Sequence, residues 1–110
     1  MDYRKLFDEI IATYRKHGWQ LQRALLRPES VAELKAELAK LEAARLDESE
    51  VDALWFSRPS HEQREAWELR LISENPFALF ETFEKDEQEE DREEVRKEME
   101  ARLRDYASKK

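Results

Sequence analysis

The fold class is decided by residues 51–84, which read VDALWFSRPSHEQREAWELRLISENPFALFETFE. This stretch holds three short runs that are rich in aromatic residues, and turns that contain proline separate them. The runs cover residues 53–57, 66–73 and 77–83. Bulky runs bounded by proline turns are typical of strands, and three in succession predict an antiparallel meander.

The second run shows the strand pattern most clearly. Trp67, Leu69 and Leu71 alternate with Glu68 and Arg70, and a period of two places the two sets on opposite faces of a sheet. On a helix the same three apolar residues would be spread around the cylinder. We therefore predict a strand for this run, and a helix stays open as the alternative for the third run.

The N-terminal segment predicts a helix. Its apolar residues recur at spacings of three and one, which forms a single stripe. The stripe consists of Tyr3, Leu6, Phe7, Ile10, Ile11 and Tyr14. It ends at His17-Gly18, where the only glycine of the chain suits the left-handed position after a helix.

Two further helices are predicted from their charges and apolar spacing. Ser30 and Glu33 have the spacing of a capping box, so we expect a helix from Ser30 to about Ala44 or Arg45, followed by an acidic connection over 46–50. The last helix is predicted over 86–107, with an acidic start in residues 84–94 and a basic end. Its apolar residues are few, and it either docks on the sheet or projects from it.

A fourth strand is predicted between the first two helices, where Trp19, Leu21 and Leu25 share one alternation phase. The order of elements is then α-β-α-β-β-β-α. We expect a single α+β domain over residues 1–110, with a small antiparallel sheet of three to four strands and helices packed mainly on one face.

Composition and charge exclude several classes of function. The 110 residues carry a net charge of −7, and residues 84–94 alone hold eight carboxylates against Lys85 and Arg92. An acidic balance disfavours nucleic acid and anionic membranes as partners. No apolar run approaches the ~20 residues of a membrane span, and the first residues lack a signal-peptide apolar block. We therefore expect a cytoplasmic protein.

The sequence shows no pattern that points to catalysis. The absence of cysteine excludes a thiolate nucleophile or ligand, and a single glycine excludes a glycine-rich phosphate loop. His17 and His61 lack the spacing of paired metal ligands. Ser57 and Ser60 lie close to His61, but no glycine is present for an oxyanion hole. We predict no catalytic residue, no metal site and no cofactor, and a binding protein more than an enzyme.

The candidate binding residues come from tryptophan and arginine, which are enriched at binding hot spots. They are Trp19, Arg23, Trp55, Arg58, His61, Glu68 and Arg70. At least two of the three tryptophans are expected in the core, because a small α+β domain needs their volume. Arg70 projects from the face opposite Trp67, so an uncovered face would present Glu68 and Arg70 as a flat polar surface.

The leading hypothesis is a non-enzymatic protein that binds another protein or a second copy of itself, as an adaptor or regulatory module. The uncovered sheet face or an unpaired edge strand would be the docking surface. A first alternative is a small-ligand or anion-binding protein, or a minor enzyme, with a pocket between sheet and helices that uses Arg23, Arg58, His61 or Arg70. A second alternative is an acidic partner that neutralises a basic protein through residues 84–94.

Overall fold

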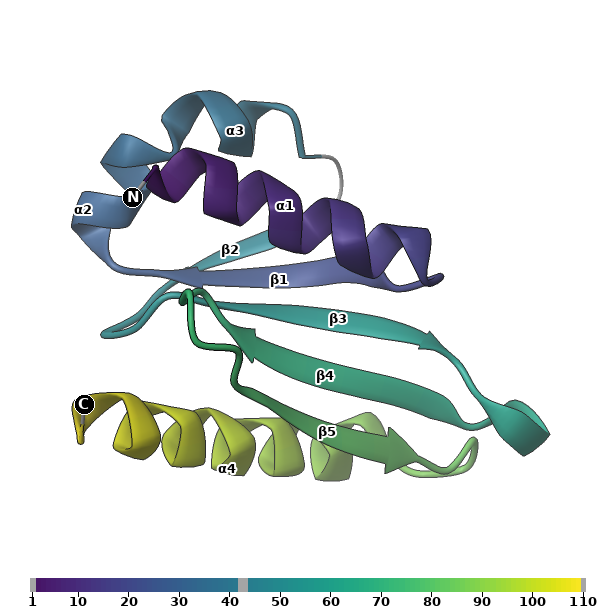
Figure 1. Ribbon diagram of the computed structural model, residues 1–110. Coiled ribbons are helices and arrows are strands. Elements are labelled where there is room, and N and C mark those ends of the chain that lie inside the picture. Colours follow the sequence, from purple (N-terminus) through teal and green to yellow (C-terminus); the bar gives the residue numbers. More distant parts are fainter. Residues whose placement is uncertain (1, 42–43, 110) are drawn as a thin grey trace.

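Five strands form one mixed sheet in the computed structural model, which describes residues 2–41 and 44–109 (Figure 1). Their order across the sheet is β2-β1-β3-β4-β5. The strands are β1 Gln20–Leu26, β2 Arg45–Glu48, β3 Ala53–Pro59, β4 Glu65–Leu71 and β5 Ala78–Phe83. The predicted meander is confirmed, since β3, β4 and β5 pair antiparallel in sequence order, and the run 77–83 is a strand.

Strand β2 corrects the prediction of an antiparallel sheet with three to four strands. It occupies Arg45, near which the second helix was expected to end, and the first part of the expected acidic connection over 46–50. It pairs parallel with β1 from Arg23↔Arg45 to Leu26↔Glu48. Its charged side chains carry no strand pattern. Hydrogen bonding to the outer edge of β1 therefore holds β2 in place. The side chains of β2 do not indicate this pairing in the sequence.

Helices cover both faces of the sheet, whereas the sequence predicted helices mainly on one face. α1 Tyr3–Lys16 lies on one face beside α2 Pro28–Glu33 and α3 Lys35–Ala39, and α4 Glu89–Ser108 lies on the other (Figure 1). The last helix therefore docks on the sheet.

The central strand β3 is buried on both faces. Leu54 and Phe56 pack in the core on the α1 side, with Phe7, Ile10 and Ile11 of α1. Ala53 and Trp55 pack in the core on the α4 side, with Met99 and Leu103 of α4. This two-sided burial explains why residues 53–56 are apolar without alternation.

The first helix agrees with its prediction. Asp2 caps it by accepting a hydrogen bond from the Lys5 amide, and the chain leaves it through His17 and Gly18. The φ of Gly18 is +87°, which lies in the left-handed region that a side chain disfavours. The predicted role of the only glycine is thus confirmed.

The predicted helix from Ser30 is wrong in its start and in its length. The chain instead forms α2 and α3, which are separated at Leu34, and α3 ends at Ala39. Ser30 is not a cap, because α2 begins at Pro28 and the Ser30 hydroxyl is buried. Residues 42–43, over which the predicted helix extends, lie outside the described residues.

A β-bulge in β1 overturns the predicted alternation of Leu21 and Leu25. The register places Leu21 opposite Phe56 and Arg23 opposite Trp55, so Gln22 is the extra residue. The side-chain amide of Gln22 donates a hydrogen bond to the Ser57 hydroxyl at 3.0 Å. The bulge shifts the alternation of β1 by one residue. Leu21 therefore faces α1, whereas Leu25, which was predicted to share its face, lies on the α4 side. Arg23 is thereby turned beneath α4.

Asp52 ties the N-terminal parts of three elements together. Its carboxylate accepts hydrogen bonds from the Tyr3 hydroxyl, from the Ser30 hydroxyl at 2.5 Å, and from the Arg27 amide and guanidinium at 2.8 and 3.0 Å. Burial acts to raise the pKa of Asp52, but these donors outweigh burial and the pKa lies below its usual value. Burial, followed by the bond to Asp52, raises the pKa of Tyr3 well above its ordinary range.

Asp52→Asn is expected to lower the free energy of unfolding by about 2–4 kcal/mol at pH 7, because buried donors lose a charged acceptor. Since the pKa of Asp52 is lower in the folded chain, its contribution is complete above the unfolded value of about 3.9 and is lost as the pH falls through the folded value. Urea unfolding of both chains at several pH values should therefore show the difference shrinking in acid. Asp47→Asn on the surface of β2 is the control, and an equal loss in both variants would contradict this role.

Candidate functional site

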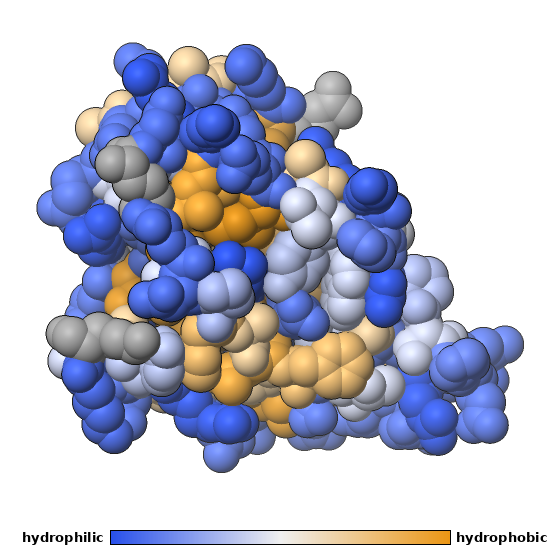
Figure 2. Space-filling view, viewed as in Figure 1, coloured by the Kyte–Doolittle hydropathy of each residue, from blue (hydrophilic) through white to orange (hydrophobic). Residues whose placement is uncertain are grey.

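On the α1 side of the sheet, β5 carries exposed side chains, whereas β4 is partly covered, because Ala66 is buried and Tyr14 of α1 bonds to Glu68. Residues that pair across antiparallel strands share a face, so the register groups six side chains on this side. They are Ala66, Glu68 and Arg70 of β4, with Thr82, Phe80 and Ala78 of β5 opposite them. Ala66 is buried, so we call the other five residues the open face. Figure 2 shows apolar atoms gathered below α1, over β4 and β5.

Phe80 is the main apolar group of the open face. Its exposed fraction is 59%, against 47% for Leu46, the other large apolar residue found exposed among the described residues. Ala78, also on β5, is exposed beside it. A large exposed phenylalanine at the centre of a strand is a candidate contact for a partner.

Two side chains, one just after α1 and one on β3, support Phe80 from one side. The Trp19 ring meets the Phe80 ring edge to face, with centroids 6.4 Å apart. The Arg58 guanidinium lies over the Trp19 ring at 4.4 Å and donates a hydrogen bond to the His17 carbonyl at 2.6 Å. Trp19 itself is buried, so it contributes rigidity to this side of the open face.

The polar residues of the open face are held by local bonds. Glu68 accepts a hydrogen bond from the Tyr14 hydroxyl, and burial followed by this bond raises the pKa of Tyr14 well above its ordinary range. The Arg70 guanidinium donates to the carbonyls of Leu71 and Ser73 at 3.0 and 3.3 Å. The structure thus brings Glu68 and Arg70 onto one face, as the alternation indicated.

The other three predicted residues lie elsewhere. His61 is exposed in the 3-10 turn η1 His61–Gln63, between β3 and β4. Trp55 is fully buried under α4, where its indole nitrogen donates to Glu100 at 2.8 Å. Arg23 is buried under the same helix and donates twice to Glu93, at 2.8 and 3.1 Å. Trp55 and Arg23 therefore fasten α4 to the sheet and do not join the open face.

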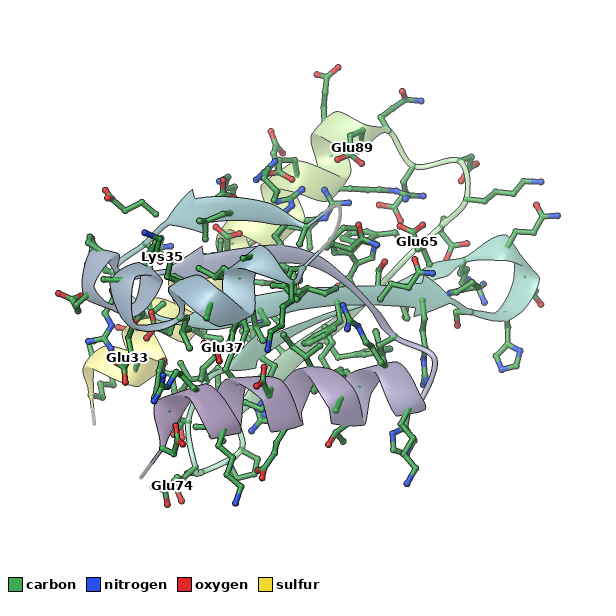
Figure 3. The ribbon with its side chains drawn as sticks, turned by 90° about the horizontal axis from the view of Figure 1, so that it is seen from above. Glu33, Lys35, Glu37, Glu65, Glu74 and Glu89 are labelled. Atoms are coloured by element: carbon green, nitrogen blue, oxygen red, sulfur yellow. The ribbon has the colours of Figure 1, made fainter. Side chains whose placement is uncertain are left out.

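Arg96 of α4 was not among the residues predicted from the sequence, but it holds α4 on the sheet. It is only 1% exposed, and its guanidinium lies 4.0 Å from the centroid of the Trp67 ring. It also donates to Glu89 and Glu93, each at 2.8 Å. In Figure 3, seen from above, Glu89 lies at the end of α4 that is farthest from α1. The arginine supplies contact area that the few apolar residues of this helix lack.

Arg96 and Phe80 were both left out of the predicted binding residues, although each follows a pattern in the sequence. Arg96 shares a helical stripe with Met99 and Leu103, at spacings of three and seven. Phe80 shares the phase of Ala78 and Thr82 within the third aromatic run.

Two adjoining cavities lie between β2 and α4, with volumes of about 550 and 670 Å³. Both are lined by Arg45 and Lys97, together with carboxylates such as Glu100 in one and Glu93 in the other. Among the cations predicted for anion binding, only Arg23 lines either of these two cavities, and Glu93 already holds it. Their mixed charges give them no preference for one sign of ligand.

Within residues 2–41 and 44–109, no group of three or more histidine, aspartate or glutamate side chains is placed to hold a metal ion. Among the helices of the same residues, none has the length and apolar character needed to cross a membrane.

Glu93→Gln is expected to lower the free energy of unfolding by about 1–2 kcal/mol at pH 7, since Arg23 and Arg96 lose a charged partner. Hydrogen bonds from Arg23 lower the pKa of Glu93 to about 2, with a further contribution from Arg96. The stabilisation is therefore complete above the unfolded value of about 4.3 and is lost as the pH falls toward 2.

Urea unfolding at pH 7, 5 and 3, followed by tryptophan fluorescence, measures this difference. Glu94→Gln on the exposed side of the same helix is the matched control and should change stability by less than about 0.5 kcal/mol. A Glu93 effect that does not depend on pH would show that the charge is not what fastens α4.

The chain matches no protein-family model, no curated protein and no solved structure.

Proposed function

We propose that this chain is a non-enzymatic protein-binding module that takes up a protein segment at the open face and the free edge of β5. The observation that carries the proposal is Phe80, which is 59% exposed at the middle of an edge strand. Interfaces are commonly anchored by aromatic residues set in well-packed surroundings.

The backbone of β5 adds a second reason. The Leu71 amide donates to the Phe77 carbonyl at 2.9 Å, so the odd-numbered residues of β5 bond to β4. Alternate residues of an antiparallel strand point their backbone groups the other way. The amides and carbonyls of Ala78, Phe80 and Thr82 therefore point outward, and no partner for them exists among the described residues.

The two edges of the sheet differ in how far they permit pairing. β2 has four residues, three of which are charged, and short charged strands block the addition of another strand. β5 has six residues, of which only Glu81 is charged. This difference favours β5 as the edge at which an extended protein segment docks.

The alternatives are less well supported by the contacts. A small-ligand or anion-binding protein, or a minor enzyme, would use the cavities beside β2, where paired charges of both signs face each other. An acidic partner of a basic protein would use residues 84–94, but Glu84, Glu89 and Glu93 are already paired with arginines of this chain.

Photo-crosslinking in cells of the source organism tests the proposal. A photoreactive phenylalanine analogue in place of Phe80 should form covalent adducts with a protein, and a second copy of the chain counts as such a protein. The matched control carries the analogue in place of Leu46, the other exposed large apolar residue found among the described residues. Absence of adducts at position 80, or equal adducts at both positions, would refute the proposed docking surface.

A further inference from the structure

We infer that the protein segment that docks on β5 is the β5 strand of a second copy of this chain. The two strands would pair antiparallel about a two-fold axis at Phe80, which joins two five-stranded sheets into one. This inference rests on the proposed function, because it uses the same edge and the same open face.

The register about Phe80 is self-complementary, as a two-fold interface requires. It places Phe80 opposite Phe80 of the copy, so that each ring covers the exposed surface of the other. Ala78 then lies opposite Thr82, a small residue beside a medium one, and Leu79 lies opposite Glu81. No like charges face each other along the paired residues, and like charges directly opposite would destabilise the pairing.

The backbone suits the same register. Ala78, Phe80 and Thr82 are the residues whose amides and carbonyls point outward. An axis at Phe80 makes each of them part of a hydrogen-bonded pair, which gives about six new backbone hydrogen bonds. An axis displaced along the strand would leave some of these groups unpaired.

The charge of α4 favours a second copy over an unrelated strand. α4 runs antiparallel along β5, since Phe77 stacks on Tyr106 at 3.6 Å and Arg92 lies over the Phe83 ring at 5.5 Å. A two-fold axis at Phe80 therefore places the two α4 helices on the same face of the joined sheet, running in opposite directions. The acidic stretch 84–94, with a net charge of −6, then faces residues 95–109 of the copy, with a net charge of +2, across the axis. Opposite charges across an interface favour this pairing and its direction.

The mass of the full chain in solution is the first measurement. Sedimentation velocity between about 1 and 200 μM should show a species of twice the 13.3 kDa mass of one chain. Phe80→Glu places two carboxylates opposite each other at the axis and should weaken the dimer at least about 100-fold. Leu46→Glu is the matched control and should remain dimeric. Because both residues are exposed, thermal unfolding should show both variants folded.

Engineered cysteines test the register, because the chain has no cysteine of its own. Ala78→Cys and Thr82→Cys are made as separate variants and then mixed under oxidising conditions. Paired residues of this kind lie about 5.5 Å apart at Cα, within the range of a disulfide. Mixing should yield cross-linked dimers, whereas each variant alone should yield few, because two copies of one position are too far apart.

Each result decides a different question. A chain that stays monomeric at 200 μM, or a dimer that cross-links equally well in the unmixed variants, overturns the inference. A monomer that still forms adducts from position 80 with another protein overturns the inference and leaves the proposed function standing. A monomer without such adducts overturns both.

Discussion

The burial of β3 on both faces is the constraint on which the rest of the fold depends. Leu54 and Phe56 on one face and Trp55 on the other must all be kept from water, so a helix on only one side would leave an aromatic core exposed. α1 covers the face with Leu54 and Phe56 through a continuous apolar stripe. α4 covers the other face with few apolar residues, and Arg96 stacks on Trp67 to complete its contact surface. Because α1 lies over β1 and β3, the α1 side of β5 is left exposed at Ala78 and Phe80.

The elements with strong local patterns could be predicted from the sequence. The stripe of α1, its end at Gly18 and the alternation of Trp67 with Glu68 are properties of neighbouring residues. The same alternation correctly placed Glu68 and Arg70 on one face. Tryptophan and arginine composition indicated binding residues, but it could not tell an exposed anchor from a core group. Trp55 and Arg23 proved to hold α4, and Phe80 was missed.

The remaining features depend on contacts between distant parts of the chain. Strand β2 exists because the edge of β1 lies beside it, and its own side chains carry no alternation. The bulge at Gln22 changes the face of every later residue in β1, although Trp19, Leu21 and Leu25 share one alternation phase in the sequence. Ser30 has the spacing of a helix cap but bonds to Asp52, which is 22 residues away in the chain. In each case a long-range partner outweighs a local preference.

The difference between the two sheet edges limits how large an assembly built by the proposed strand pairing could grow. A sheet with two receptive edges can add strands without end, which is the route to fibres. Here one edge ends in a four-residue strand whose side chains are mostly charged. If a second copy pairs with β5 as proposed, no receptive edge is left, and the assembly stops at two copies. The charged side chains of Arg45, Asp47 and Glu48 would then disfavour the pairing of any further strand at the β2 edge.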